Sequence, residues 1–210
     1  MEYKQSEKMA ERKQARRRRF LDVAIAQFGR LGYHAVTVPA IVAESQSSTG
    51  AFYLYFRNKE DVYVAALEEI GEQLSGALNR ATVEESRPEA RMGAVVEALV
   101  QWLAGNPPQA RMLVEAAALG GRIEQARRAI VESHVRSVSI ALEQVAPRFD
   151  ADERAVVARC WVGSVLEAGL AWLSTAPEER MEAERVAALV AEFNLRGAGV
   201  GNGTGRKGGS

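Results

Sequence analysis

Apolar residues recur three and four positions apart along most of the chain, the spacing that gathers side chains on one face of an α-helix. In residues 11–31 this stripe comprises Phe20, Leu21, Ala24, Ile25, Phe28 and Leu31. The β-branched runs bounded by turns that are typical of strands are missing. The pattern therefore predicts an all-α protein.

Helix start and stop signals divide this pattern into separate elements. Gly32 ends the first helix, Thr37 can cap a short second helix, a third short helix spans residues 48–55, and Asn58 can cap a fourth. Four further starts show the capping-box spacing, a capping residue followed three positions later by Glu or Gln: Ser86 with Glu89, Asn106 with Gln109, Asp150 with Glu153, and Thr175 with Glu178. We expect about nine helices, the longest over residues 122–146 and 151–174.

Charge is distributed unevenly, although the chain as a whole is neutral. Residues 1–60 carry 11 basic and 6 acidic side chains, a net charge of +5, and the remainder carries −5. A basic front on an acidic body indicates a module that binds polyanions, joined to a body that does not. Charge alone leaves DNA, RNA and anionic lipid open.

Catalytic and metal-binding motifs are absent from the sequence. It contains no phosphate loop, no His-Glu-x-x-His, no paired cysteines and no Gly-x-Ser-x-Gly. His34 and His134 lack metal-type spacing, and Cys160 lies in an apolar stretch where a buried, inert thiol is expected. We expect no enzyme, no metal and no cofactor. Because no apolar run approaches the roughly 18 residues of a membrane span, we also expect a cytoplasmic protein that binds no membrane.

The most informative stretch is residues 37–59, TVPAIVAESQSSTGAFYLYFRNK. Two short helices separated by a tight polar turn follow a long helix, the layout of a helix-turn-helix. Phe52 and Phe56 lie four residues apart and form the buried face of the second short helix. The outward face then comprises Gly50, Ala51, Tyr53 and Leu54, with Thr49 and Tyr55 at its margins.

These residues resemble the N-terminal signature of the tetracycline-repressor (TetR) family of bacterial transcriptional regulators. The signature is a Thr-capped helix, a turn reading Ala-Gly-Val-Ser, then Gly-x-x-Tyr-x-x-Phe and a Lys three residues on. This chain supplies Thr37, Ser48, Gly50, Tyr53, Phe56 and Lys59 in register. It departs from the signature at Ser45-Gln46-Ser47, which replaces Ala-Gly-Val, and at Ala40, which replaces an acidic residue.

The resemblance implies a DNA-binding role for nine residues. Those expected at phosphates or the groove edge are Thr37, Ser48, Ala51, Tyr53 and Lys59, and those expected to face bases are Thr49, Gly50, Leu54 and Tyr55. Since no Arg, Asn or Gln lies on the outward face, we predict specificity from thymine-methyl contacts by Leu54 or Ala51 and from DNA shape. Arg16 to Arg19 either reach a DNA backbone or minor groove, or form a solvated basic helix face.

The resemblance and the composition of the chain together set the expected domains. Residues 1–10 form a flexible arm, 11–60 the three-helix DNA-binding domain, 61–196 a helical domain for effector binding and dimerisation, and 197–210 a disordered tail containing seven glycines.

Two sets of residues in the helical domain are candidates for partner binding. Small residues that let helices approach closely suggest a homodimer interface at Gly163, Ser164, Ala168, Gly169 and Trp172, with packing inside one subunit as the alternative. Candidate effector-pocket residues, each also readable as ordinary core, are Trp102, Met112, His134 and Trp161. The acidic balance of this domain favours a neutral or cationic apolar effector over an anion.

The leading hypothesis is a dimeric regulator, a repressor released from a palindromic double-stranded DNA operator by a small molecule. The competing hypothesis is an all-α protein-interaction or anionic-surface-binding module without sequence-specific DNA recognition.

Overall fold

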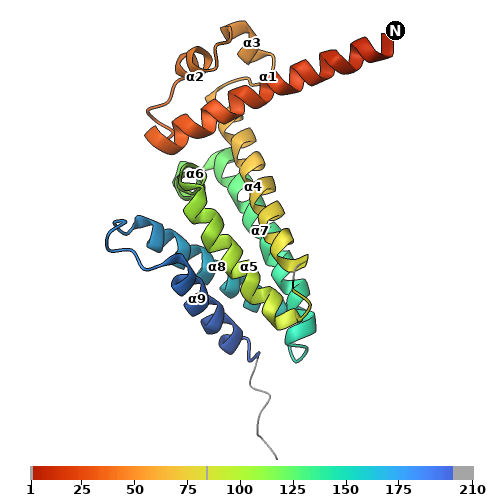
Figure 1. Cartoon of the computed structure of the whole chain (residues 1–210), viewed down its shortest axis with the longest axis vertical. Helices are drawn as coiled ribbons and strands as arrows, with labels where there is room; N and C mark the ends of the chain where they lie inside the picture. The colour runs from red at the N-terminus through yellow and green to blue at the C-terminus, as the bar shows by residue number, and fades with distance from the viewer. Residues whose placement is uncertain (1, 84, 201–210) are drawn as a thin grey trace, which may run out of the picture. The chain divides into compact units, whose positions relative to one another are not determined.

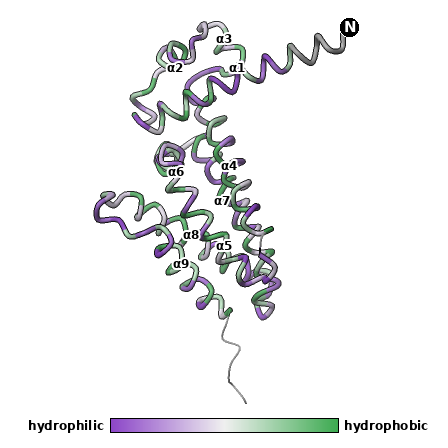
Figure 2. The backbone as a smooth tube through the Cα atoms, in the orientation of Figure 1, coloured by the Kyte–Doolittle hydropathy of each residue, from purple (hydrophilic) through white to green (hydrophobic). Residues whose placement is uncertain are grey.

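The computed structural model describes residues 2–83 and 85–200, and within them it is built from helices joined by turns (Figure 1). The helices are α1 (Glu2–Leu31), α2 (Val38–Glu44), α3 (Thr49–Tyr53), α4 (Lys59–Val83), α5 (Pro88–Gly105), α6 (Pro107–Leu119), α7 (Gly121–Val145), α8 (Ala151–Ser174) and α9 (Ala183–Gly197). Hydrophobic and hydrophilic residues alternate along them, as Figure 2 shows. The predicted all-α class is confirmed.

The chain forms two compact units that do not follow the predicted boundaries at residues 60 and 61. The first unit extends to Ile70 and also contains Pro107–Arg127; the second contains Gly71–Asn106 and continues from Arg128. Helix α6 and the start of α7, which sequence reasoning assigned to the second domain, therefore belong with the helix-turn-helix.

The apolar stripe of α1 lies in the core of the first unit, except for Leu31, which is 48% exposed. Phe20 and Phe28 are fully buried, and the Phe28 ring lies 4.8 Å from that of Tyr63 in α4. Helix α6 closes this core: the Tyr63 hydroxyl donates to the carbonyl of Met112 (3.0 Å), and Glu115 accepts from the backbone N–H of Tyr33 (2.8 Å). Helix α6 thus packs with residues some 50 to 80 positions earlier in the chain.

Gly29 allows α1 and α6 to approach each other closely. A Cβ atom at this position would overlap the side chain and backbone of Pro108. Arg111 of α6 also donates to the carbonyl of Arg30 (2.9 Å), one of the carbonyls that the end of α1 leaves without a helical partner.

In the second unit, α5 packs against both α8 and α9. Gly169 of α8 faces Leu103 of α5, and the Ser164 hydroxyl of α8 donates to Oδ1 of the buried Asn194 in α9 (2.9 Å). Small and hydrogen-bonding residues thus bring these helices together within one chain.

Both chain ends differ from expectation. Helix α1 begins at Glu2 rather than near residue 11, because residues 2–10 contain good helix formers and no Gly or Pro; the predicted arm over 1–10 is wrong across this stretch. At the other end, Ala198 and Val200 are buried, so the predicted tail does not begin at 197. The rest of that tail, 201–210, lies outside the described residues.

One of the four predicted capping boxes forms, that of Asp150 and Glu153, with both reciprocal hydrogen bonds present. Helix α5 begins one residue later than Ser86 predicts and has no side-chain cap. Asn106 instead donates to the carbonyl of Trp102 at the end of α5 (2.8 Å), and Thr175 ends α8.

Helix α8 corrects the expectation that no segment approaches a membrane span. Among the described helices it is the one long and apolar enough to cross a membrane. Length and composition are weak evidence, because the core helix of a folded domain can meet the same test. In this structure Trp161, Val162 and Val165 of α8 are buried within the second unit.

Candidate nucleic-acid interface

Two capped helices and an unusual turn form the helix-turn-helix. Thr37 accepts from the backbone N–H of Ala40 at the start of α2 (3.3 Å), and Ser48 accepts from that of Ala51 at the start of α3 (3.1 Å). Between them Gln46 has a φ of 51°, the left-handed region that glycine adopts without steric cost. The turn without glycine therefore keeps a glycine-like backbone.

Ser45 stabilises the same turn from inside. It is 1% exposed, and its hydroxyl donates to the carbonyl of Val42 (2.9 Å) at the end of α2. A buried hydroxyl with a backbone partner costs little, whereas an unpaired one costs about 1–3 kcal/mol. The replacement of Ala-Gly-Val by Ser-Gln-Ser is thus accommodated by hydrogen bonding.

Three phenylalanines fix helix α3 against α1. Phe52 is fully buried and Phe56 is 3% exposed, as the four-residue spacing predicts. The Phe52 ring lies 5.5 Å from Phe20, edge to face, and 5.4 Å from Phe56. Aromatic pairs at such distances are favourable beyond their buried area, so this contact sets which face of α3 remains outside.

That remaining face exposes apolar and aromatic side chains. Leu54 is 73% exposed and Tyr53 54% exposed, and nothing lies within 4 Å of a Cβ atom placed at Gly50. Thr49 is also exposed, whereas Ala51 and Tyr55 are half-buried. We call Thr49, Gly50, Tyr53 and Leu54 the exposed arc. A surface with little charge and room at Gly50 can approach base edges closely.

Two residues assigned to DNA by resemblance have contacts within the chain. The Lys59 ammonium donates to the carbonyls of Tyr33 (2.8 Å) and Val36 (3.0 Å) and lies 4.3 Å from the Tyr33 ring centre. Tyr55 packs 6.1 Å from Phe20. Lys59 therefore joins the start of α4 to the loop after α1, with one N–H left for another partner.

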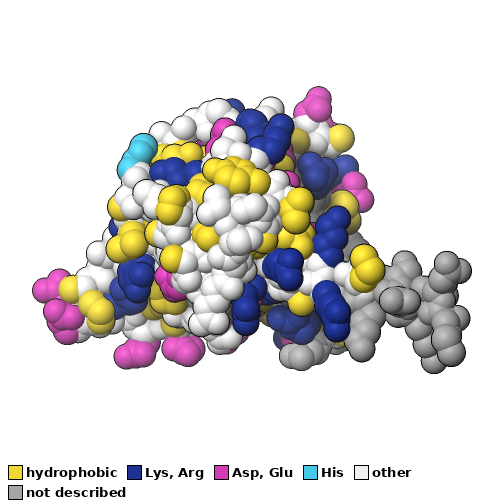
Figure 3. All heavy atoms as spheres, turned by 90° about the horizontal axis from the view of Figure 1, so that it is seen from above, with side chains coloured by type: hydrophobic (Ala, Val, Ile, Leu, Met, Phe, Trp, Pro, Cys, Tyr) yellow, Lys and Arg dark blue, Asp and Glu magenta, His cyan; other side chains and the backbone are white. Residues whose placement is uncertain are grey.

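A polar hollow of about 520 Å³ opens beside the turn. Arg16 and Arg19 of α1 form one side, and Ser47, Ser48 and Gln46 the other. Lys and Arg side chains surround a largely uncharged centre on the face shown in Figure 3. Guanidinium and hydroxyl groups around a hollow are suited to an anionic oxygen such as that of a phosphate.

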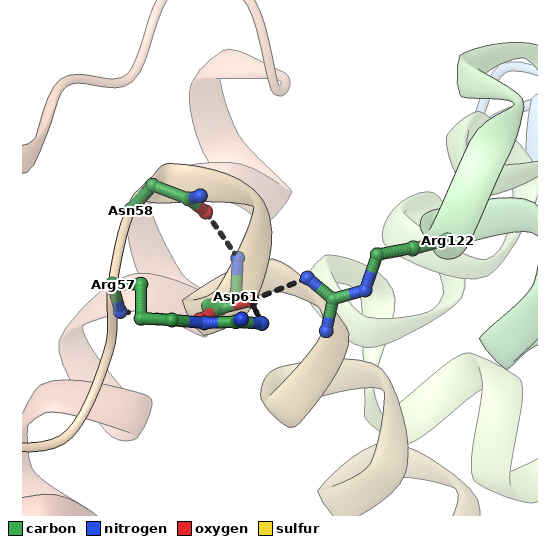
Figure 4. A network of polar contacts seen from close by, with 4 residues as sticks. All are labelled: Arg57, Asn58, Asp61 and Arg122. Carbon is green, nitrogen blue, oxygen red and sulfur yellow. Dashed lines mark hydrogen bonds and ion pairs between the residues drawn. The ribbon is translucent and has the colours of Figure 1, made fainter.

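An ion-pair network fixes the start of α4 (Figure 4). The Asp61 carboxylate accepts from the guanidinium groups of Arg57 (2.9 Å to Oδ1) and Arg122. The backbone N–H of Asp61 in turn donates to the side-chain oxygen of Asn58 (2.8 Å). These hydrogen bonds hold the pKa of the Asp61 carboxyl well below its usual range. The network ties the segment after α3 to the beginning of α7. Only the Asn58 cap was predicted, because Arg122 is remote in sequence.

The second unit contains a cavity of about 460 Å³ between the end of α4 and helices α5, α7 and α8. Of the four candidate effector residues, His134 and Trp161 line it. Trp102 and Met112 do not line it, and Met112 is buried in the first unit; their role in effector binding stays a prediction. The other residues that line the cavity were not predicted, because apolar cavity residues follow the same helical periodicity as ordinary core residues.

The predicted dimer residues contribute mainly to packing within the chain. Gly169 and Ser164 contact α5 and α9, Ala168 is half-buried, and the Trp172 indole donates to the carbonyl of Met181 (2.6 Å). Gly163 is the exposed member of the set. The contacts of Gly169, Ser164 and Trp172 are packing inside one subunit, the alternative weighed from the sequence, and the dimer role of the set stays a prediction.

Exposed apolar side chains lie elsewhere on α8 and near α9. Val156 is 61% exposed, Phe193 69%, Met181 49% and Leu189 42%, and Cys160 is exposed rather than buried as expected. Val156, Cys160 and Gly163 follow a four- and three-residue spacing and share one face of α8.

A buried aromatic anchor, two capped short helices and an exposed arc define the helix-turn-helix class of protein. Residues 20–66 match the family model described as "Bacterial regulatory proteins, tetR family". Residues 20–66 are therefore similar to the helix-turn-helix domain of TetR-family regulators.

Known proteins similar to this chain agree with that assignment. The HTH-type transcriptional repressor KstR of Mycolicibacterium smegmatis is 30% identical over 103 residues, covering 49% of this chain and 50% of KstR. The chain matches about half the length of its curated relatives.

Solved structures share the fold over a longer span. A TetR-family regulator from Syntrophomonas wolfei has a TM-score of 0.74 at 20% identity, covering 88% of this chain and 95% of the other. The regulator FadR from Bacillus subtilis, solved in complex with stearoyl-CoA, has a TM-score of 0.72 at 19% identity, covering 85% and 97%. The N-terminal helix-turn-helix followed by a helical domain is thus the architecture of these proteins.

Proposed function

We propose that this protein is a sequence-specific DNA-binding transcriptional regulator acting in the cytoplasm. The observation that carries the proposal is the exposed arc itself. Burial of Phe52 and Phe56 fixes the orientation of α3, so that Tyr53 and Leu54 are left more than half exposed. Large apolar side chains held outward beside an open glycine are suited to docking in a major groove.

Phosphate contacts then come from both sides of the arc. We assign Arg16 and Arg19 to the DNA backbone, because they line the polar hollow together with Ser47 and Ser48. Thr37, Ser48 and the remaining N–H of Lys59 supply further contacts at the groove edge. Base reading is left to Leu54, Thr49 and Gly50, with Ala51 and Tyr55 at the margin; thymine methyl groups and DNA shape supply the specificity.

The functional form is a homodimer joined through α8 and α9. Val156, Cys160 and Gly163 on α8, with Leu189 and Phe193 on α9, form the apolar face that a second copy covers. Two-fold symmetry places two copies of α3 about 34–36 Å apart on DNA, so that each reads one half of a palindrome.

The regulator acts as a repressor whose release depends on a small molecule in the 460 Å³ cavity. Two similar proteins support the proposal: KstR is named a repressor, and FadR was solved in complex with stearoyl-CoA. Release is a population shift, in which the ligand binds the form unable to engage DNA more tightly than the competent form.

Selection of the full-length protein against a library of random duplexes tests the proposal. We expect an enriched inverted repeat, bound at least ~10³-fold more tightly than random DNA in fluorescence anisotropy at fixed salt. Tyr53→Ala should weaken binding to the selected duplex while leaving the melting temperature unchanged, since Tyr53 is more than half exposed.

Salt-dependent binding without sequence preference would overturn the proposal. That outcome would favour a module that binds anionic surfaces through its basic helix face.

A further inference from the structure

We infer that the cavity of the second unit recognises an uncharged apolar molecule by one hydroxyl group, and that His134 is the residue that binds this group. The inference deepens the proposed function, because it names the chemistry of the effector. It rests on the lining, the free nitrogen of His134 and the size of the cavity.

The lining is apolar with one charged residue. Leu78, Val96, Leu99 and Val165 are among its aliphatic side chains, and Arg91 is its sole charge. No Asp or Glu among the described residues lines the cavity. A cation would enter without a counter-charge, at a large desolvation cost, so the cationic alternative kept open from the sequence is dropped.

His134 contributes a polar side chain to the lining of the cavity. Its Nε2 is buried and has no hydrogen-bond partner within the described chain. Burial lowers the pKa of the imidazole, so the neutral form prevails at pH 7. A buried nitrogen without a partner is unfavourable, and a ligand that pairs with it removes that cost.

Two neighbouring hydroxyl groups and one N–H of Arg91 already donate to backbone carbonyls. The hydroxyl of Ser133 donates to the carbonyl of Ile130 (2.7 Å), and that of Ser137 donates to the carbonyl of Ser133 (3.1 Å). Nε of Arg91 donates to the carbonyl of Glu85 (2.6 Å). A ligand hydroxyl suits His134 because it can donate to Nε2 or accept from it, whichever tautomer is present.

The volume limits the size of the ligand. At roughly 30 Å³ per water molecule, 460 Å³ corresponds to about 15 waters, hence to a molecule of about 10–15 non-hydrogen atoms. The lined stretch of α7 runs from Ser133 to Gln144, about 16 Å at 1.5 Å per residue, so an elongated molecule fits.

Three probes with the same ten-carbon chain test the inference on the free protein: 1-decanol, decanoate and decyltrimethylammonium. Binding is followed by tryptophan fluorescence, since Trp161 lines the cavity. We expect 1-decanol to bind at least fivefold more tightly than the other two. His134→Leu should weaken decanol binding five- to tenfold, as expected for one lost hydrogen bond. His134→Gln keeps a donor and an acceptor, so its affinity for decanol should lie within about threefold of that of the original protein.

The second histidine provides the matched control. His34 is exposed and lies in the first unit, so His34→Leu should bind all three probes unchanged. His134→Met is a second apolar replacement should the Leu variant fold poorly.

Tightest binding by decanoate would move recognition to Arg91 and overturn the inference. Tightest binding by the ammonium, no binding of decanol, or unchanged decanol binding after both apolar substitutions would also overturn it. Because no DNA is present in this assay, such a failure is distinct from failure of the duplex selection.

Discussion

Replacing Leu54 by Ala tests whether the exposed arc docks on DNA. The change removes three carbon atoms, worth about 2.4 kcal/mol at 0.8 kcal/mol for each buried CH₂. Since Leu54 is 73% exposed in the free protein, about 1.7 kcal/mol of this remains to be gained on full burial. If half of this free energy is gained when Leu54 enters a groove, the variant loses about 0.9 kcal/mol of binding free energy per half-site. For a dimer on two half-sites the affinity for DNA then falls roughly 15- to 20-fold.

The assay is fluorescence anisotropy with the duplex obtained by selection, alongside thermal unfolding. Folding stability should change by less than about 0.5 kcal/mol, because a mostly exposed side chain contributes little. Val114→Ala, which truncates an exposed apolar residue of α6, should leave DNA affinity unchanged. Affinity within twofold of the original protein for Leu54→Ala, or an equal loss in both variants, would refute the reasoning.

Four further changes probe other features. Gly29→Ala should lower stability by about 1–3 kcal/mol in urea unfolding, because its methyl group overlaps Pro108; an unchanged midpoint would contradict the close contact. Gln46→Gly should raise stability by up to about 1 kcal/mol by relieving the positive φ, and a loss would argue against the turn geometry. The folded-state pKa of Asp61 is depressed, so the stabilisation by its carboxylate is present at neutral pH and lost as pH falls below about 4. Asp61→Asn should therefore lower the free energy of unfolding by about 1–2 kcal/mol at pH 7, and the difference between the two proteins should shrink in acid. A difference that stays constant with pH would exclude a stabilising role of the ion pairs. Phe193→Glu should convert the proposed dimer to a monomer in sedimentation analysis, and a persistent dimer would place the interface elsewhere.

The helix-turn-helix was predictable because its determinants are local. Thr37 and Ser48 cap helices three residues away, and Phe52 and Phe56 share a face through helical periodicity alone. The caps and the buried face of α3 can both be predicted because they depend on residues four positions apart or fewer. The functional assignments of these residues remain predictions.

Features that depend on distant partners could not be read from the sequence. Asn106 has the spacing of a capping box, yet its amide bonds to the preceding helix, since a local rule cannot rank competing partners. Gly169 has the small size expected at a subunit interface, but α5 occupies that space. The cavity at His134 depends on four helices at once, so composition could not reveal it.

The inclusion of α6 in the first unit makes that unit discontinuous in sequence. A fragment cut after the helix-turn-helix, near residue 60, would lack both Tyr63 and the helix that covers Phe28 and Gly29. Its newly bared aromatic surface would favour aggregation. Isolated DNA-reading fragments of this chain therefore need residues 107–127 supplied, for instance by a linker that bypasses the second unit.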